Sequence, residues 1–158
     1  MVQENFECVI NAEPWKPQAP LENYITGMFG ANTQVALKCR YDEYNGNNGI
    51  TITANRYRKQ DTTYLHSSLD FSMPNVAPGV TYSFTNISGP LSGKPIVHFY
   101  TESNCFYSNY DQGNIVTGTL NVTEFSKTER KISGTFLFQL QNPCGVINIS
   151  QGKFSSSF

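Results

Sequence analysis

The last third of the chain alternates between apolar and polar residues with a period of two. This alternation predicts antiparallel β-strands with one face in a hydrophobic core and the other in water. Two polar turns divide the region into three strands, and the second turn, residues 142–145, has proline and glycine where a tight turn favours them. The apolar rows expected to face the core are Val116, Gly118, Leu120 and Val122, then Ile132, Gly134, Phe136, Phe138 and Leu140, and the third strand runs from Val146 to Phe154.

The same period of two recurs upstream, where glycine, proline and asparagine separate the apolar runs. About nine strands at spacings of roughly a dozen residues predict an all-β fold, either an antiparallel β-sandwich or a partly open barrel. We expect one β domain over residues 5–158 after a flexible terminus at residues 1–4, with at most one helical turn at residues 21–25. Trp15, bracketed by prolines, is expected to close one end of the core. The six upstream strands are expected at residues 6–10, 35–41, 50–54, 65–73, 80–84 and 96–101.

Composition supports a β protein and argues against two classes of function. Aromatic residues make up 13% of the chain and charged residues only 15%, and tyrosine, phenylalanine and threonine favour strands. A net charge of -1 lacks the basic surface that nucleic-acid binding needs, so no nucleic-acid partner is expected. No apolar run approaches the ~20 residues of a membrane-spanning helix.

The four cysteines do not form a Cys-x-x-Cys pair, which disfavours a zinc site or a thioredoxin-like motif. Few lysine and glutamate residues among many threonine, asparagine, serine and tyrosine residues favour an exported protein, in which neighbouring cysteines oxidise. We expect a disulfide between Cys105 and Cys144, because both lie in turns that precede the final strands and can meet at one end of the sandwich. Cys8 and Cys39 lie on inward-facing rows, so they either pair or remain buried thiols.

No motif assigns a catalytic role. His66 and His98 each lie on a predicted strand without an Asp-x-His or His-x-His arrangement, so we interpret them as strand-surface residues. The sequence has no nucleophile elbow, phosphate loop or calcium loop. We therefore expect no enzyme activity, no cofactor and no metal. A hydrolase with two carboxylates across a cleft stays an alternative, because a sequence alone cannot show that geometry.

The least ordinary segment, residues 104–113, is rich in tyrosine, asparagine and serine and is longer than a simple turn needs. Binding loops on rigid β scaffolds have this composition. In the competing interpretation, the cysteine and the phenylalanine of this segment fix it to the fold and its tyrosines only cover one end. The residues expected to bind a ligand are Tyr107 and Tyr110, through their ring faces, and Asn109 and Asp111, through hydrogen bonds to its polar edges.

Near its start the chain contains Phe6-Glu7-Cys8-Val9-Ile10-Asn11-Ala12-Glu13-Pro14-Trp15, and it later contains Ile132-Ser133-Gly134-Thr135-Phe136-Leu137-Phe138 and Ile149-Ser150-Gln151-Gly152-Lys153-Phe154. These stretches resemble the F-x-x-x-I-N-G-x-x-W, I-S-G-T-F-x-F and I-x-x-G-x-F motifs of a family of small Bacteroidota lipoproteins of unknown function. One departure is Ala12, where the family more often has glycine. The resemblance implies a β-sandwich-like domain, export, and a place in the cell envelope, in the periplasm or at the outer membrane surface. It also implies that the only membrane attachment is a lipid anchor on a cysteine upstream of residue 1.

Three hypotheses for function follow. The favoured one is a non-enzymatic exported module of the lipoprotein type that binds a glycan, a small ligand or an envelope protein through its loops. The second is a structural component of envelope assembly, and the third is a carboxylate-based hydrolase. A pocket ringed by tyrosines and amides would favour the first class, a flat apolar patch the second, and two carboxyls converging in a deep pocket the third.

Overall fold

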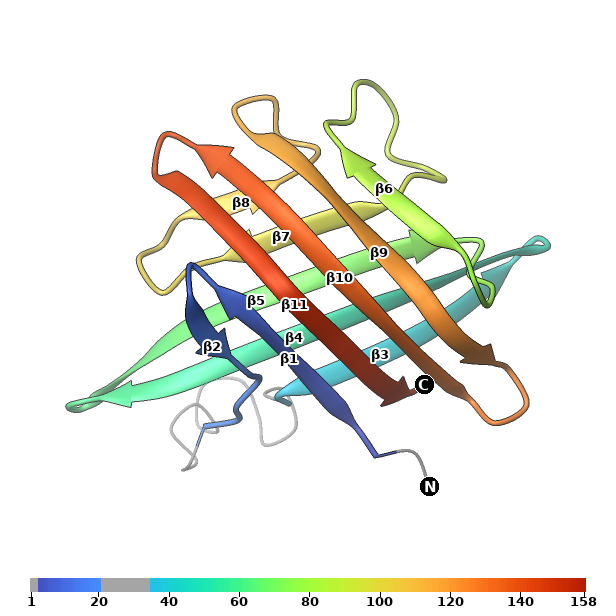
Figure 1. The fold of residues 1–158 in the computed structure, drawn as a ribbon, viewed down its shortest axis with the longest axis horizontal. Helices are drawn as coiled ribbons and strands as arrows, with labels where there is room; N and C mark the ends of the chain where they lie inside the picture. Colours follow the sequence, from blue (N-terminus) through green and yellow to red (C-terminus); the bar gives the residue numbers. More distant parts are fainter. Residues whose placement is uncertain (1–2, 21–34) are drawn as a thin grey trace.

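The computed structural model describes residues 3–20 and 35–158, which form eleven β-strands and no helix (Figure 1). The strands make two antiparallel sheets that pack face to face and do not close into a barrel, so the fold is a β-sandwich. The expected helical turn at residues 21–25 lies outside the described residues. The six-stranded sheet has the order β2 (Glu13–Trp15), β1 (Asn5–Ile10), β11 (Gly145–Ser157), β10 (Lys131–Asn142), β9 (Ile115–Ser126) and β6 (Thr81–Thr85). The five-stranded sheet has the order β3 (Leu37–Tyr44), β4 (Asn47–Gln60), β5 (Thr63–Pro74), β7 (Ile96–Tyr100) and β8 (Phe106–Ser108).

The nine strands expected from the alternation are all present, and two short ones, β2 and β8, join them. The three C-terminal strands lie side by side in the six-stranded sheet, with β10 between β9 and β11 (Figure 1). The strands of the five-stranded sheet run obliquely behind them. The segment at residues 104–113, which has the composition of a binding loop, contains the short strand β8.

Phenylalanine faces glycine across neighbouring strands in the centre of the six-stranded sheet. Phe136 lies opposite Gly152, and Phe138 lies opposite Gly118. A Cβ atom at Gly152 would lie 2.4 Å from the Phe136 ring, and one at Gly118 would lie 2.3 Å from the Phe138 ring. Each glycine therefore leaves the space into which the opposite aromatic ring packs.

The core between the sheets is built largely from phenylalanine rings. Phe71 of β5 is fully buried, and its ring centroid lies 4.8 Å from that of Phe136 and 5.3 Å from that of Phe138. Ile132 and Leu140 of β10 are also fully buried. The expected inward face of β10 is thus confirmed, and burial of this apolar surface is the main stabilising contribution to the fold.

The β4–β5 hairpin is longer than the strands beside it. β3 pairs with β4 only as far as Ala54, and β7 pairs with β5 only from Ser68 to Ser72. Gln18 continues the edge beyond β3 through a short parallel bridge to Arg56. The far end of the hairpin therefore projects past β1 and β2, at the left of Figure 1.

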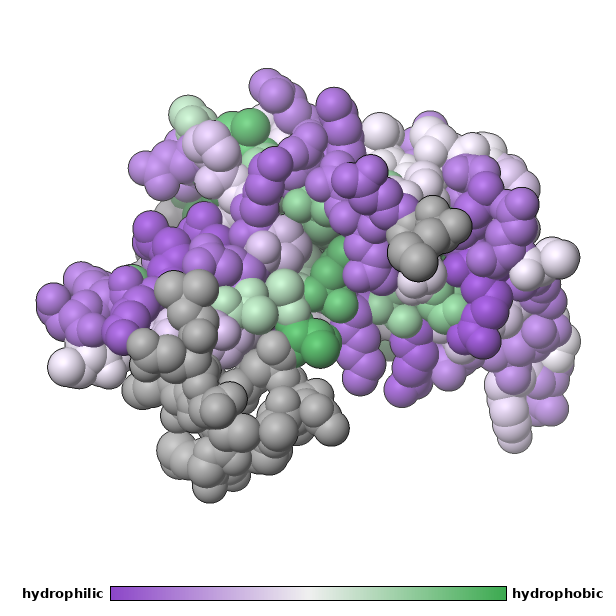
Figure 2. All heavy atoms as spheres, turned by 90° about the horizontal axis from the view of Figure 1, so that it is seen from below, coloured by the Kyte–Doolittle hydropathy of each residue, from purple (hydrophilic) through white to green (hydrophobic). Residues whose placement is uncertain are grey.

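Figure 2 shows the molecule from below, where a strip of apolar side chains lies among polar ones. Between the start of β1 and the start of β3 there is a depression of about 570 Å³, lined in part by Phe6, Pro17, Val35 and Leu37. Residues 21–34 directly precede Val35 and lie outside the described residues. We therefore assign no role to this depression.

Candidate functional site

An open cleft of about 550 Å³ is lined by residues of both sheets, mainly from β1 and β2 with the turn between them, the β7–β8 turn and the β4–β5 hairpin. Its volume falls within the range of ~300–1,000 Å³ that is usual for small-molecule sites. Apolar side chains form one part of the lining and a group of charged side chains forms another. The apolar part includes Ile10, Trp15, Leu65, Phe99 and Ile147, and the polar part includes Arg56, Arg58, Ser67, Glu102 and Ser103.

Strand alternation explains why two arginines line the cleft. β4 and β5 pair without a bulge, so the face that carries Ile52 and Ala54 carries Arg56 and Arg58 further along. Ile52 and Ala54 are fully buried, whereas the two arginines lie where the hairpin leaves the sandwich. The inner face of one strand therefore changes from apolar to cationic at the edge of the core.

The carboxylate of Glu102, in the β7–β8 turn, pairs with both guanidinium groups. Arg58 donates from Nε to Oε1 at 2.8 Å and from its terminal nitrogen to Oε2, which makes a two-pronged contact. Arg56 donates to Oε1 at 3.3 Å. The side chains of Arg56 and Glu102 are 19% and 17% exposed, but that of Arg58 is 52% exposed, so one arginine is largely enclosed and the other reaches solvent.

The electrostatic state of this group follows from its contacts. Hydrogen bonding from Arg58 lowers the pKa of Glu102 below its usual value, against the opposing effect of burial. Burial lowers the pKa of Arg56, while the charge of Glu102 opposes that change. The Nε atom of Arg56 is buried and has no hydrogen-bond partner among the described residues. One carboxylate thus serves two guanidinium groups and leaves one buried donor unsatisfied.

Trp15 forms the floor of the cleft and also closes this end of the core, as its proline-bracketed position predicted. The indole is 2% exposed, and its Nε1 donates to Ser67 Oγ at 3.1 Å. The guanidinium carbon of Arg56 lies 5.5 Å from the indole centroid, a cation–π distance. The tryptophan is therefore in contact with the charged group and with the apolar core at once.

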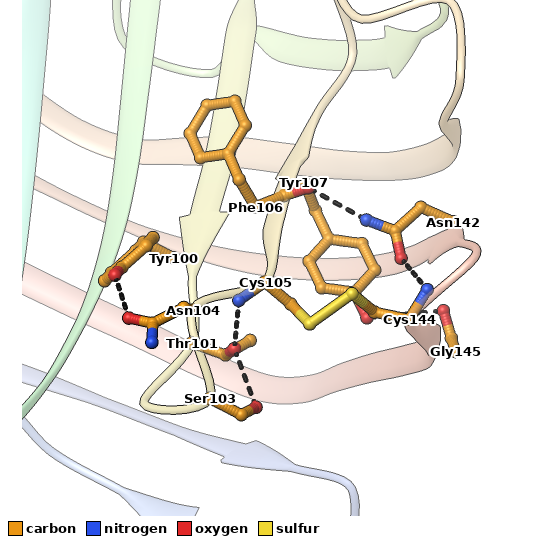
Figure 3. Close-up of a disulfide and its surroundings, with 10 residues drawn as sticks. All are labelled: Tyr100, Thr101, Ser103, Asn104, Cys105, Phe106, Tyr107, Asn142, Cys144 and Gly145. Carbon is orange, nitrogen blue, oxygen red and sulfur yellow. Dashed lines mark hydrogen bonds between the residues drawn. A yellow bond between two sulfur atoms is a disulfide. The ribbon is translucent and has the colours of Figure 1, made fainter.

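The turn that carries Glu102 is fixed by hydrogen bonds and a disulfide (Figure 3). Cys105 N donates to Thr101 Oγ1 at 3.0 Å, and Thr101 N donates to Cys105 O at 2.9 Å. Cys105 is bonded to Cys144, so the β7–β8 turn is tied to the β10–β11 turn of the other sheet. This confirms the expected pairing and indicates an oxidising, extracytoplasmic location.

Cys8 and Cys39 are free thiols that do not pair with each other. Cys8 is buried in β1 and Cys39 is half-buried in β3, on opposite sheets. Burial raises the pKa of each thiol to about 12. Of the two outcomes left open by the sequence, the structure shows unpaired thiols, but only Cys8 is fully buried.

Two of the four residues expected to bind a ligand are buried, so their predicted exposure is wrong. Tyr107 lies on β8 with 1% of its surface exposed, and its ring packs into the core between the sheets. Asn109 is also 1% exposed, and its side chain accepts a hydrogen bond from Val97 N at 3.0 Å and donates to Pro95 O at 2.9 Å. Both side chains hold the segment in place and offer no surface to a ligand.

Tyr110 and Asp111 are exposed but do not line the cleft. Tyr110 is 38% exposed, and its ring centroid lies 6.3 Å from that of Phe106, which is 37% exposed. Asp111 Oδ1 accepts a hydrogen bond from Gly113 N at 2.9 Å, which closes a local turn. Phe106 also contacts His98, with ring centroids 5.5 Å apart, so these rings form a small aromatic surface on the outer face of the five-stranded sheet.

The two histidines lie on that same outer face, as strand-surface residues with polar partners. His98 Nε2 lies 2.8 Å from Asp70 Oδ2, and His66 Nε2 lies 3.0 Å from Asn55 Oδ1. Ser108 lies opposite His98 on β8, but it is fully buried and its Oγ accepts a hydrogen bond from Asp111 N. This row therefore holds a His–Asp pair beside a serine that solvent does not reach.

Neither a metal centre nor a membrane-spanning helix is found among the described residues. They contain no group of three or more histidine, cysteine, aspartate or glutamate side chains that could hold a metal ion. They also contain no helix of the length and hydrophobicity that a membrane span requires.

The fold and the cleft define an extracytoplasmic all-β sandwich with a mixed apolar and charged opening between its sheets. No protein-family model, curated protein or solved structure matches the chain. The cleft was not predicted from the sequence. A signal was present, because charged Arg56 and Arg58 continue the inward row of Ile52 and Ala54 in the sequence.

Proposed function

We propose that this protein is a non-enzymatic exported binding module that holds a small ligand in the cleft between its sheets. The observation that carries the proposal is the enclosed group of Arg56, Glu102 and Trp15 at the base of an open cleft with apolar walls. Small-molecule sites commonly combine apolar walls with a few placed polar groups. An enclosed ion pair stabilises a fold poorly compared with apolar packing, so recognition is a better reason for its presence than stability.

The proposal includes a place in the cell envelope through a lipid anchor upstream of residue 1. The disulfide supports the coarser part of this statement, an oxidising compartment outside the cytoplasm. The lipid anchor rests on the resemblance to small Bacteroidota lipoproteins. Labelling of cells with a radioactive fatty acid, followed by capture of the full-length protein, tests the anchor directly, and absence of label overturns it.

The single tryptophan makes the cleft testable without a label. A ligand that enters the cleft approaches Trp15 and Arg56, so it should change the intrinsic fluorescence of the protein and raise its melting temperature. We would screen small anions, fatty acids and oligosaccharides by both readouts and confirm each hit by calorimetry.

A matched pair of variants on β11 then locates the site. Ile147 lines the cleft, whereas its neighbour Val146 is 44% exposed and does not line it. Ile147→Tyr fills the cleft and should weaken any cleft ligand at least tenfold, whereas Val146→Tyr should leave affinity unchanged. Equal affinities of the two variants for every hit would overturn the proposed function.

A second candidate is contact with a glycan through the aromatic surface of His98, Phe106 and Tyr110. It is favoured by the exposed rings of Phe106 and Tyr110, since exposed rings stack on sugar faces. The variant Phe106→Ala with Tyr110→Ala would abolish binding in a glycan screen if this surface acts, and would leave it intact if the cleft acts.

A further inference from the structure

The carboxylate of Glu102 occupies the position that an anionic ligand group would take in the cleft. Two guanidinium groups from one strand face converge on it, and Arg58 contacts it with both prongs. Arginine recognises carboxylate, sulfate and phosphate groups through this two-pronged geometry. The two guanidinium groups therefore have the arrangement of an anion site, and the carboxylate of Glu102 fills it.

The charged side chains around the cleft can balance the charge of one ligand anion. Among residues 3–20 and 35–158, four charged side chains line it, namely Arg56, Arg58, Glu13 and Glu102. Glu13 is exposed, so solvent screens its charge, whereas Glu102 is enclosed. When the Glu102 side chain rotates out, two guanidinium groups and the unsatisfied Arg56 Nε remain without an enclosed anion.

The backbone of the β7–β8 turn is fixed, but the side chain of Glu102 takes no part in the contacts that fix it. Hydrogen bonds between Thr101 and Cys105 and the disulfide to Cys144 hold the turn. Within the part of the chain that the structure describes, the carboxylate itself is held only by Arg56 and Arg58, and Arg58 is half exposed. Exchange of this carboxylate for a ligand anion therefore needs a side-chain rotation and no rearrangement of the fold.

We propose, on the basis of the proposed function, that the ligand carries one anionic group beside an apolar body. The anionic group replaces the carboxylate of Glu102 on Arg58 and Arg56, and the apolar body lies against Leu65, Phe99 and Ile147. Glu102 acts as an internal competitor, which keeps the guanidinium groups paired when the cleft is empty and lowers the affinity for every anion that binds there.

Four probes with one apolar body separate the charge from the body, namely octanoate, octyl sulfate, 1-octanol and octylammonium. Acetate and inorganic sulfate provide the head groups alone. Affinities would be measured by calorimetry and by Trp15 fluorescence below the concentrations at which the probes form micelles. In the wild type, octanoate and octyl sulfate should bind about tenfold more tightly than octanol, as expected for hydrogen bonds to a charged partner.

Two variants test the exchange itself. Glu102→Gln removes the competing charge while keeping the shape of the side chain, so it should raise the affinity for octanoate and octyl sulfate about tenfold and leave octanol unchanged. Arg58→Gln should reduce octanoate to the affinity of octanol. Glu43→Gln is the matched control, because Glu43 pairs with Lys127 away from the cleft, and it should change neither affinity.

The outcomes distinguish this inference from the proposed function. The inference is overturned if octanoate and octanol bind with equal affinity, or if Glu102→Gln does not raise the affinity for octanoate and octyl sulfate. It is also overturned if neither of these two probes binds to the wild type or to Glu102→Gln. If Ile147→Tyr still weakens the ligands found in the screen in those cases, the proposed function stands. Binding of acetate and octanoate with equal affinity shows that the apolar walls contribute nothing and overturns the ligand class.

Discussion

Replacing Phe138 with alanine removes a ring from the centre of the sandwich, where the structure leaves little to fill the gap. The side chain is 3% exposed, and its ring centroid lies 5.3 Å from that of Phe71 and 5.0 Å from that of Phe84. Both neighbours are fully buried, and Gly118 on the adjacent strand has no side chain that could move into the space. The cavity should therefore persist, which places the loss near the middle of the ~3–5 kcal/mol range for Phe→Ala substitutions.

Urea denaturation followed by circular dichroism measures this loss as a shift in midpoint at constant slope. A loss of ~4 kcal/mol is a large part of the ~5–15 kcal/mol by which domains are usually stable. Leu137→Ala is the matched control, because Leu137 precedes Phe138 on the same strand and is 57% exposed on the opposite face. It should change the free energy of unfolding by at most ~0.5 kcal/mol. A loss below about 1 kcal/mol for Phe138→Ala, or equal losses for the two variants, would refute the reasoning.

Three further predictions concern packing, the disulfide and pH. Gly152→Ala places a Cβ 2.4 Å from the Phe136 ring, so we expect a loss of ~1–3 kcal/mol in urea denaturation, and wild-type stability would contradict the packing described. Removing the disulfide by Cys105→Ser with Cys144→Ser opens a link across a sequence separation of 39, which should cost ~2–4 kcal/mol of unfolding free energy by the same assay; an unchanged midpoint would contradict this. The lowered pKa of Glu102 implies a contribution to stability that is present above the usual value of 4.5 and is lost as the pH falls through the lower folded-state pKa. Glu102→Gln should therefore show a flatter dependence of stability on pH below 4.5 than the wild type, and parallel curves would contradict the assignment.

The sequence predicted the strands well because burial on one face of a sheet imposes a period of two on the chain itself. It predicted the faces of those strands, such as the inward Phe136 and Phe138, for the same reason. Alternation carries no information about which strand lies beside which. The pairing of β1 with β11, and of β6 with β9, joins segments far apart in the chain and was therefore not predicted.

The expected exposure of Tyr107 and Asn109 was wrong, and for Tyr107 the reason lies in the length of β8. This strand has three residues, too few to show a period, so Tyr107 appeared to belong to a loop although it faces the core. Asn109 looked like an exposed amide because its partners are backbone atoms of distant residues, which no local pattern reveals. The partnership of Glu102 with Arg58 depends likewise on a tertiary contact across 44 positions.

The two free thiols, Cys8 and Cys39, bear on how the disulfide forms during oxidative folding. Four cysteines allow three sets of pairings, and a thiolate that attacks a disulfide converts one set into another. In the folded protein burial raises the pKa of both Cys8 and Cys39 to about 12, so almost none of either thiol is ionised at pH 7. Folding therefore keeps Cys8 and Cys39 protonated, and a protonated thiol does not attack the Cys105–Cys144 bond. We therefore expect disulfide exchange in the unfolded chain and little exchange once the chain has folded.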